Sequence, residues 1–438
     1  MDVIFKCCAG LDVHQKDVWA CVRKLQDNGR VQKEIKRFGT MTADLMSLAA
    51  WLKERGVTHT AMESTGVLWK PVYNILEGQI PEVWLCNAKH MRNLPGRKTD
   101  VKDCDWIAQL MMCGLLRKSF VPPKPVRQLR DLTRLRAGFE EDKTRVSNRI
   151  HKVLEDANIK LGAVASDILG VSGRAMLWQL IGGESDGVKL AQLAKGVLKK
   201  KSAQLEQALT GFVSPHHRAL LRTLMEQLNS LEQSIARTDA LIADEMQEAD
   251  KAAQAAPVAM TPPESKKEAS AVKPPLPFLE AVKLLSGILG IKGRNAENIL
   301  AEIGTDMKHW VTDRHFVSWA GVCPGNNISA GKSQGGATNK GNNWLRRAIT
   351  QSAWVSARSK KTFYGARYRR LAKRRGKQRA IVAVTSSMLK AIYHMLRDHV
   401  AFQDLGPEYY QKDNTKMARA ATRTLERLGY KVKLEPAA

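Results

Sequence analysis

Four acidic residues in the first quarter of the sequence are candidates for metal-dependent chemistry. Asp12 lies in GLDVHQKDVW, among β-prone residues, and Glu63 lies in TAMESTG at the end of another predicted strand. Asp100 and Asp103 lie in KTDVKD, where a spacing of three places both on one face of a predicted helix's first turn. Carboxylates from three segments can hold two metal ions roughly 4 Å apart, which clamp the attacking and leaving oxygens of a phosphodiester. Hard oxygen ligands favour Mg²⁺ or Mn²⁺.

Each of these acids also has an ordinary structural interpretation, so only the set is informative. Asp100 follows Thr99 at a predicted helix start, where capping alone would explain it. Asp105 would lie on another side of that helix, and we leave it out of the site. Asp17, five residues after Asp12 on one predicted strand over residues 7–25, would point to the opposite face.

A second candidate for chemistry is the loop NNISAGKSQGG, residues 326–336, which carries Ser329 and Ser333. A serine held near a scissile phosphate, with cations to stabilise developing charge, is what a phosphoserine-forming nuclease or recombinase requires. Most serines and glycines in such loops are turn formers that contact phosphate at most. The loop's own residues do not distinguish the two serines.

The charge of the chain predicts a polyanionic partner. It has 70 Lys and Arg against 43 Asp and Glu, a net charge of +27. The residues between Asp313 and Asp398 include no acid at all but hold 18 Lys and Arg, where the chain average would give about eight acids. We expect this stretch, with Phe363, Tyr364 and Tyr368 interleaved, to bind a phosphate backbone. The basic residues expected to do so are Lys332, Lys340, Arg346, Arg347, Arg367, Arg369, Arg370, Lys373, Arg374 and Arg375.

The remaining composition indicates a cytoplasmic protein without a membrane partner. No apolar run approaches the roughly 18 residues of a membrane span. The first residues, MDVIFKCCAG, lack the layout of a signal peptide. Seven cysteines without a C-x-x-C pair are expected to be reduced thiols rather than disulfides or zinc ligands.

The patterns along the chain predict five regions. Residues 1–125 alternate strand-like and helical segments, which favours an α/β layer fold with its acids at strand ends. Residues 126–250 have apolar residues every three to four positions, typical of a coiled coil or a long helical hairpin, with a plain bundle as the alternative. Residues 251–276 are rich in Ala, Pro, Lys and Ser and predict a linker. A mainly α region, 277–400, and a tail, 401–438, follow.

A glycine-containing turn near the start of the fourth region is a further candidate for phosphate contact. In LLSGILGIKGRNAENILAEIG, residues 284–304, glycines separate two helical stretches, as in a helix-hairpin-helix turn. Such a turn either offers backbone N–H groups to a phosphate or is merely structural, and the sequence leaves both open.

Together, the four acids and the serine loop resemble those of the DEDD-type insertion-sequence transposases, which are bridge-RNA-guided serine recombinases. Their N-terminal domain is similar to the RuvC-type Holliday-junction resolvases and has an RNase H-like fold. The matching segments are GLDVH, MESTG and KTDVKD, then FVSWAGVCPGNNISAG followed by NKGNNWLRRAI, which is similar to the family's transposase domain. The two halves occur in the expected order and the resemblance covers most of the chain.

The resemblance implies roles for individual residues. The family's nucleophile lies five residues after the proline of its AG-x-x-P motif, and Pro324 plus five is Ser329. Here SAG replaces the Ser-Gly of other branches. Asp12, Glu63, Asp100 and Asp103 would hold Mg²⁺ or Mn²⁺, and Ser333 would be a loop residue. The linker at 251–276 matches no part of the family.

The resemblance also implies partners and a setting. The family acts on donor and target DNA as a dimer of dimers, guided by a structured non-coding RNA that supplies sequence recognition by base pairing. The active site would be assembled between protomers. The protein would be prokaryotic and associated with the nucleoid when bound to DNA.

Two other functions fit parts of the sequence. In a metal-dependent nuclease or Holliday-junction resolvase, water would replace the serine as nucleophile. In a non-catalytic nucleic-acid-binding protein, the acids would be structural and the basic stretch would act alone. An actin-like sugar or acetate kinase, suggested by GLDV, lacks the further glycine-rich phosphate loops and leaves the charge of +27 unexplained.

Overall fold

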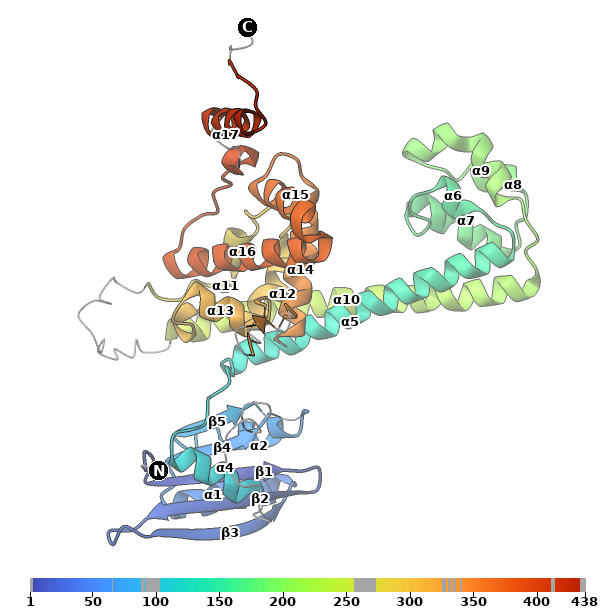
Figure 1. Cartoon of the computed structure of the whole chain (residues 1–438). Helices are drawn as coiled ribbons and strands as arrows, with labels where there is room; N and C mark the ends of the chain where they lie inside the picture. Colours follow the sequence, from blue (N-terminus) through green and yellow to red (C-terminus); the bar gives the residue numbers. More distant parts are fainter. Residues whose placement is uncertain are drawn as a thin grey trace. The chain divides into compact units, whose positions relative to one another are not determined.

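The computed structural model describes most of the chain and divides it into two compact units, Met1–Val121 and Pro122–Ala438 (Figure 1). The described residues are 3–64, 66–87, 91, 103–255, 273–324, 328–329, 332–333, 336–338, 341–410 and 414–433. No helix among them is long and apolar enough to cross a membrane. All seven cysteines are free thiols, as predicted.

The first unit is built on a mixed five-stranded sheet in the order β3-β2-β1-β4-β5. The first three strands pair antiparallel, and β1, β4 and β5 pair parallel. This arrangement is consistent with the predicted RNase H-like fold. The strands are β1 (Cys7–Val13), β2 (Asp17–Leu25), β3 (Val31–Gly39), β4 (His59–Glu63) and β5 (Glu82–Cys86).

Three helices cover the two faces of this sheet. The odd-numbered residues of β1, such as Ala9 and Leu11, pack with α1 and α2, whereas Cys8 packs with α4. Because successive strand residues point to opposite faces, the remaining even-numbered residues of β1 also lie on the α4 side. The helices are α1 (Thr42–Glu54), α2 (Trp69–Leu76) and α4 (Asp103–Met112).

The prediction of one strand over residues 7–25 was wrong, because this segment forms the β1–β2 hairpin. The turn is closed by a hydrogen bond of 2.9 Å from His14 N to Asp17 O. The polar segment HQK has no apolar side chain to bury, so the chain reverses there. Asp17 therefore lies on β2, two residues before Trp19, whose strand partner is Asp12. Strand alternation puts Asp17 on the α4 side and not on the opposite face.

The second unit begins with two long helices, α5 (Lys124–Asp156) and α10 (Pro215–Ala255), which lie side by side (Figure 1). The helix α10 continues five residues into the range predicted as a linker, because the Ala-rich start of that range is a good helix former. Four short helices close one end of the pair around a core that includes Ile150, Met176 and Leu205. They are α6 (Leu161–Val164), α7 (Val171–Gly182), α8 (Gly187–Ala191) and α9 (Ser202–Leu209).

The rest of the second unit is mostly helical, as predicted, and is built around α16. Buried residues recur along α16 every three to four positions, from Ile381 to Leu396, which is the spacing of one apolar helix face. The helices are α11 (Phe278–Leu285), α12 (Gly293–Ile303), α13 (Asp313–Trp319), α14 (Asn343–Arg358), α15 (Phe363–Arg375), α16 (Lys377–Asp398) and α17 (Asn414–Arg427). A small hairpin, β6 (Ile328–Ser329) and β7 (Lys332–Ser333), interrupts them.

Candidate active site

Asp12 and Glu63 lie at the carboxyl ends of neighbouring parallel strands. The β1–β4 register pairs Leu11 with Met62, and the two acids are the next residues along each strand. Ala61, two residues before Glu63, belongs to the cluster that packs on α4. Strand alternation therefore places both acids on the α4 side of the sheet.

Gly10 brings α4 close to this pair of strands. A Cβ atom built on Gly10 would lie 2.2 Å from the Cys104 carbonyl oxygen and 2.3 Å from the Ala108 nitrogen, so only glycine permits the contact. Asp103 is the first residue of α4. The close approach of the helix thus brings a third carboxylate toward Asp12.

We expect Gly10→Ala to test this packing. The added methyl group would push α4 away from β1, which should lower the free energy of unfolding by about 1–3 kcal/mol. Denaturant unfolding would measure the loss. Gly138→Ala, where an added Cβ meets nothing within 4 Å on α5, should instead be neutral or stabilising by up to about 1 kcal/mol. Equal effects of the two substitutions would contradict the packing argument.

The electrostatics of the acids show that they interact. Burial raises the pKa of Asp12 above its usual value, and the nearby charges of Asp103 and Glu63 raise it further, while His14 opposes the shift. The His14 Nε2 lies 3.0 Å from the Asp12 Oδ2. Carboxylates that repel one another when ionised are stabilised by a bound cation.

The described acids alone do not form a metal site. Across the described ranges, no group of three or more His, Cys, Asp or Glu side chains is arranged to hold a metal ion. The fourth predicted ligand, Asp100, lies outside the described residues. Oxygen donors of this kind nevertheless have the chemistry that a divalent cation requires.

The two rival acids are both engaged in ion pairs. Asp105 is 1% exposed, and its carboxylate accepts hydrogen bonds from Arg23 Nε at 2.7 Å and Lys33 Nζ at 2.9 Å. Burial opposes ionisation of Asp105, but these hydrogen bonds outweigh it and lower the pKa of this carboxyl. Asp17 accepts a hydrogen bond of 2.8 Å from Arg37 Nε. Asp105 thus fastens α4 to β2 and β3.

The serine loop forms the β6–β7 hairpin. Ser329 pairs with Lys332 in its ladder, and Ile328 pairs with Ser333. The structure describes the backbone of these four residues and not their side chains. A bridge between Pro324 and Thr338 closes the base of the hairpin. A Cβ on Gly341 would lie 2.4 Å from the Ala320 carbonyl carbon, so the returning chain passes directly against the end of α13.

Glu302 anchors the point where this loop returns into α14. Asn342 caps α14 by accepting hydrogen bonds from Trp344 N at 3.0 Å and Leu345 N at 3.1 Å. Its side-chain amide donates to Glu302 Oε2 at 2.6 Å. Glu302 is 2% exposed and also accepts two hydrogen bonds from Arg134 of α5, at 2.7 and 2.9 Å. One buried carboxylate therefore ties the serine loop to the long helix.

The basic stretch is only partly available to a ligand. The predicted residues Lys373, Arg374 and Arg375 are exposed at the end of α15, and Lys377 and Arg379 continue the exposed run into α16. These last two residues were not among the predicted phosphate contacts, although they lie in the same acid-free stretch. Positive charge at the start of α16 is unfavourable for the helix dipole, so α16 itself does not explain it.

Other predicted basic residues are used inside the protein. Arg367 donates to the Tyr410 hydroxyl at 2.7 Å, and Arg369 donates to the Ser359 carbonyl at 3.0 Å. Arg370 lies 4.1 Å from the Tyr410 ring centroid. Arg346 is half-buried on α14. Lys340 and the side chain of Lys332 lie outside the described residues.

The interleaved aromatic residues pack against other rings of the protein. Phe363 stacks on Tyr410, with 5.3 Å between ring centroids. Tyr364 is 2% exposed and stacks on Phe402. Tyr368 meets Trp354 edge to face.

The glycine-containing turn between α11 and α12 packs on α14. Gly290 has a φ of +92°, and a Cβ there would lie 2.5 Å from the Ser352 carbonyl oxygen. The positive φ and the close approach to Ser352 explain structurally why this position is a glycine. They favour the structural interpretation of the turn over phosphate contact.

A mixed-sheet domain with carboxylates at the ends of adjacent strands, joined to a basic helical region, defines an enzyme that acts on DNA. Comparison with known families agrees with this class. Residues 9–159 match a model of DEDD-type IS110 transposases, and residues 282–369 match the transposase IS116/IS110/IS902 family. The chain belongs to the IS110 family of transposases, since the two matches follow the chain order and cover more than half of it. No curated protein matches the chain.

Membership of this family implies DNA substrates and suggests dependence on a divalent metal. Sequence reasoning missed Glu302, although an isolated acid near the end of an amphipathic helix is a visible signal. Trp344, two residues after the cap of α14 and partly exposed, was also not among the predicted residues.

Proposed function

We propose that this transposase cuts and rejoins DNA through a covalent phosphoserine intermediate. The observation that supports the proposal is that Asp12 and Glu63 lie at the ends of adjacent parallel strands. The helix that begins at Asp103 packs closely on the same side of the sheet. The proposal also needs a nucleophile, and the transposase family match over residues 282–369 contains the Ser329 hairpin.

The proposed metal site comprises Asp12, Glu63, Asp100 and Asp103, with Mg²⁺ or Mn²⁺ as the ion. A bound divalent ion would neutralise charge on the scissile phosphate and lower the pKa of an attacking hydroxyl. The residues themselves would orient the phosphate and accept protons. Asp103 is the first residue of α4, so the close packing at Gly10 would set its distance from Asp12.

The proposed nucleophile is Ser329. Its Oγ would bond to the phosphorus while the bond from phosphorus to the 3′ oxygen breaks. The serine proton would pass to the leaving 3′ hydroxyl, by way of a carboxylate or water. The reverse step, in which a 3′ hydroxyl attacks the phosphoserine, would join the exchanged strands and release the serine. The hairpin fits this role because its base is fixed by the Pro324–Thr338 bridge and by Asn342.

The remaining parts of the proposal concern partners and organisation. The exposed cations from Lys373 to Arg379 would contact phosphates of donor or target DNA, or of a structured guide RNA that supplies sequence recognition. The helices α5 and α10 would form a coiled-coil arm within the second unit, used for dimerisation or as a spacer; the predicted domains are the carboxylate domain, 1–125, and the serine-bearing domain, 277–400. A dimer of dimers would assemble each active site between protomers. The linker proposal now concerns the residues after Ala255, and the tail 401–438 stays unassigned.

The covalent intermediate gives the decisive experiment. Wild-type protein incubated with element-end DNA and Mg²⁺ should yield a denaturation-resistant protein–DNA adduct. Ser329→Ala should abolish the adduct, because the attacking oxygen is lost, whereas Ser333→Ala, four residues away in the same hairpin, should retain it. Denaturing gels with end-labelled DNA would show both. An adduct in Ser329→Ala would refute the nucleophile, and adduct-free cleavage in Ser329→Ala would indicate a water-dependent nuclease or resolvase.

A further inference from the structure

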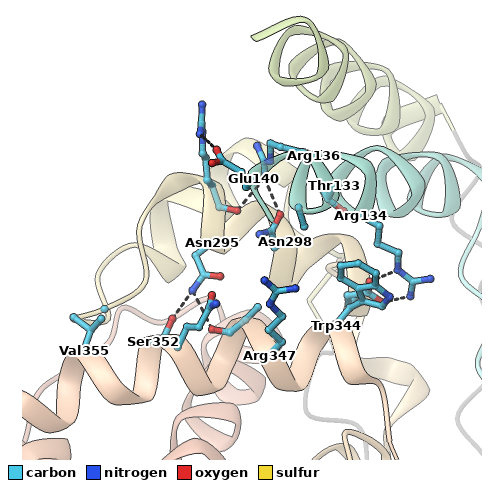
Figure 2. A pocket seen from close by; sticks show the side chains of 16 residues that line it. Thr133, Arg134, Arg136, Glu140, Asn295, Asn298, Trp344, Arg347, Ser352 and Val355 are labelled. Atoms are coloured by element: carbon cyan, nitrogen blue, oxygen red, sulfur yellow. Dashed lines mark hydrogen bonds and ion pairs between the residues drawn. The ribbon is translucent and has the colours of Figure 1, made fainter. Parts of the chain in front are cut away.

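A cavity of about 350 Å³, lined by both polar and apolar groups, lies between α5, α12 and α14 in the second unit (Figure 2). It is lined by side chains of all three helices, and none of the proposed catalytic residues contributes to it. Its size falls within the range of small-ligand sites in proteins. We therefore considered what chemistry its walls would recognise.

The buried cations of the cavity are already neutralised. Arg136 is 3% exposed, and its Nη1 donates to Asp239 at 2.9 Å and to Glu297 at 2.6 Å. Arg134 forms a double hydrogen bond with the buried carboxylate of Glu302. Because these charges are satisfied within the protein, the interior of the cavity does not require an anion. It favours a ligand that is neutral and forms hydrogen bonds.

Two asparagines of α12 offer such hydrogen bonds. Asn298 Oδ1 accepts from Arg136 Nη2 at 2.7 Å, and Asn295 Nδ2 donates to the Ala348 carbonyl at 3.1 Å and to Ser352. Within the described part of the chain, the amide NH₂ of Asn298 and the amide oxygen of Asn295 keep unused capacity. One donor and one acceptor, held by neighbouring helical turns, match the hydrogen-bonding edge of a nucleobase.

Trp344 supplies an aromatic surface at the side of the same cavity (Figure 2). The side chain is 36% exposed, and the Arg134 guanidinium lies 5.6 Å from its ring centroid. Since Arg134 is held in place by Glu302, it supports the indole from within the protein. A partly exposed tryptophan on a fixed support is suited to stacking with a base.

Arg347 lies one helical turn after Trp344, and Figure 2 shows its side chain extending into the cavity. It is 45% exposed and forms an ion pair with Glu141 of α5. Exposed ion pairs of this kind contribute little stability, so Arg347 can exchange Glu141 for a phosphate at small cost. The cavity thus combines a stacking surface, two asparagine amides and a partly exposed cation.

We propose that this cavity binds one unpaired nucleotide, with its base stacked on Trp344, its edge bonded to Asn295 and Asn298, and its phosphate on Arg347. The inference relies on the proposed function only for the nucleic-acid substrate and not on the serine or the metal. The capping residue Asn342, where the serine hairpin returns, lies two residues before Trp344. Nucleotide capture would therefore hold a strand beside the hairpin. The strand is DNA or RNA, which share this chemistry.

The test uses full-length protein with Ser329→Ala and no divalent metal, so that its outcome does not depend on catalysis. The probes are short single-stranded DNA and RNA oligonucleotides with one 2-aminopurine, whose fluorescence falls on stacking. We expect quenching and binding with one or both strands. Trp344→Ala should weaken binding about tenfold and abolish the quenching, whereas Trp344→Phe should retain most of both.

Trp178→Ala is the matched control, because Trp178 is 39% exposed on α7, far along the chain from the cavity. It should leave binding and quenching unchanged. Arg347→Ala should reduce the salt dependence of binding by about one phosphate contact. Quenching with only the DNA or only the RNA strand would identify the source of the nucleotide. Equal behaviour of Trp344→Ala and Trp178→Ala, with either strand, would overturn the proposal.

Discussion

Replacing Glu302 with alanine should lower the free energy of unfolding of the second unit by about 3–5 kcal/mol, the effect of breaking a buried ion pair by removing one partner. Glu302 is 2% exposed and accepts hydrogen bonds from Arg134 and Asn342. Arg130 Nε lies 3.2 Å from its Oε2. Burial lowers the pKa of Arg130, and Glu302 opposes that shift, so the substitution leaves this cation buried without its counter-charge.

Denaturant unfolding of the full chain would measure the loss. Glu302→Gln keeps the shape and part of the hydrogen bonding and should give an intermediate value. Glu226→Ala is the matched control, because Glu226 is exposed on α10 and its loss should change stability by no more than about 0.5 kcal/mol. If Glu302→Ala were as mild as Glu226→Ala, Glu302 would not be the anchor of α14 and the serine loop.

Asp12→Asn should abolish DNA cleavage, with a loss of at least about 10³-fold, because the amide removes the negative charge that a divalent ion requires. The same substitution should stabilise the metal-free protein at neutral pH. Burial, followed by the charges of Asp103 and Glu63, raises the pKa of Asp12 in the folded state. Ionised Asp12 is therefore penalised by folding, and asparagine carries no such penalty.

The pH dependence gives this second prediction a clear sign. At a pH below the ordinary pKa of aspartate, Asp12 is protonated in both the folded and unfolded states, so the variant and the wild type should be equally stable on this account. As pH rises through the raised pKa, the wild type loses stability relative to Asp12→Asn. Unfolding in a chelator across pH would show the divergence.

The control for Asp12→Asn is Asp27→Asn, an exposed acid in the turn between β2 and β3. It should preserve cleavage and show no such divergence. Retained cleavage in Asp12→Asn would remove Asp12 from the site. A destabilised metal-free variant would mean that Asp12 has a structural role that outweighs the repulsion.

The positions of Asp12 and Glu63 near strand ends could be predicted from the sequence, because β-prone residues precede each acid. The alternation of apolar residues in a strand is a pattern of neighbouring residues. The sequence could not show that residues 7–25 fold back at His14, since both halves of the hairpin have the same strand-like pattern. That misreading led to the wrong face for Asp17. Helical periodicity alone was enough to leave Asp105 out of the site, but its partners, Arg23 and Lys33 on neighbouring strands, could be found only from the sheet.

The basic stretch between Asp313 and Asp398 also has one property visible in the sequence and another decided by packing. Its lack of acids is a property of composition and is fully visible in the sequence. Which cations are free is decided by packing, since Tyr410 and the Ser359 carbonyl take up Arg367 and Arg369, while Lys373 to Arg379 stay exposed. Phe363 and Tyr364 likewise found partners more than 35 residues away, at Tyr410 and Phe402.

By itself, the sequence determined the order of the regions, the acids at strand ends, the serine loop and the need for a polyanionic partner, because these depend on local periodicity, composition and motif spacing. Only the tertiary structure decided that Gly10 admits α4, that Glu302 links α5 to the serine loop, and that Trp344 and two asparagines share a cavity. These contacts join residues far apart in the chain, and no local pattern encodes the distance between them.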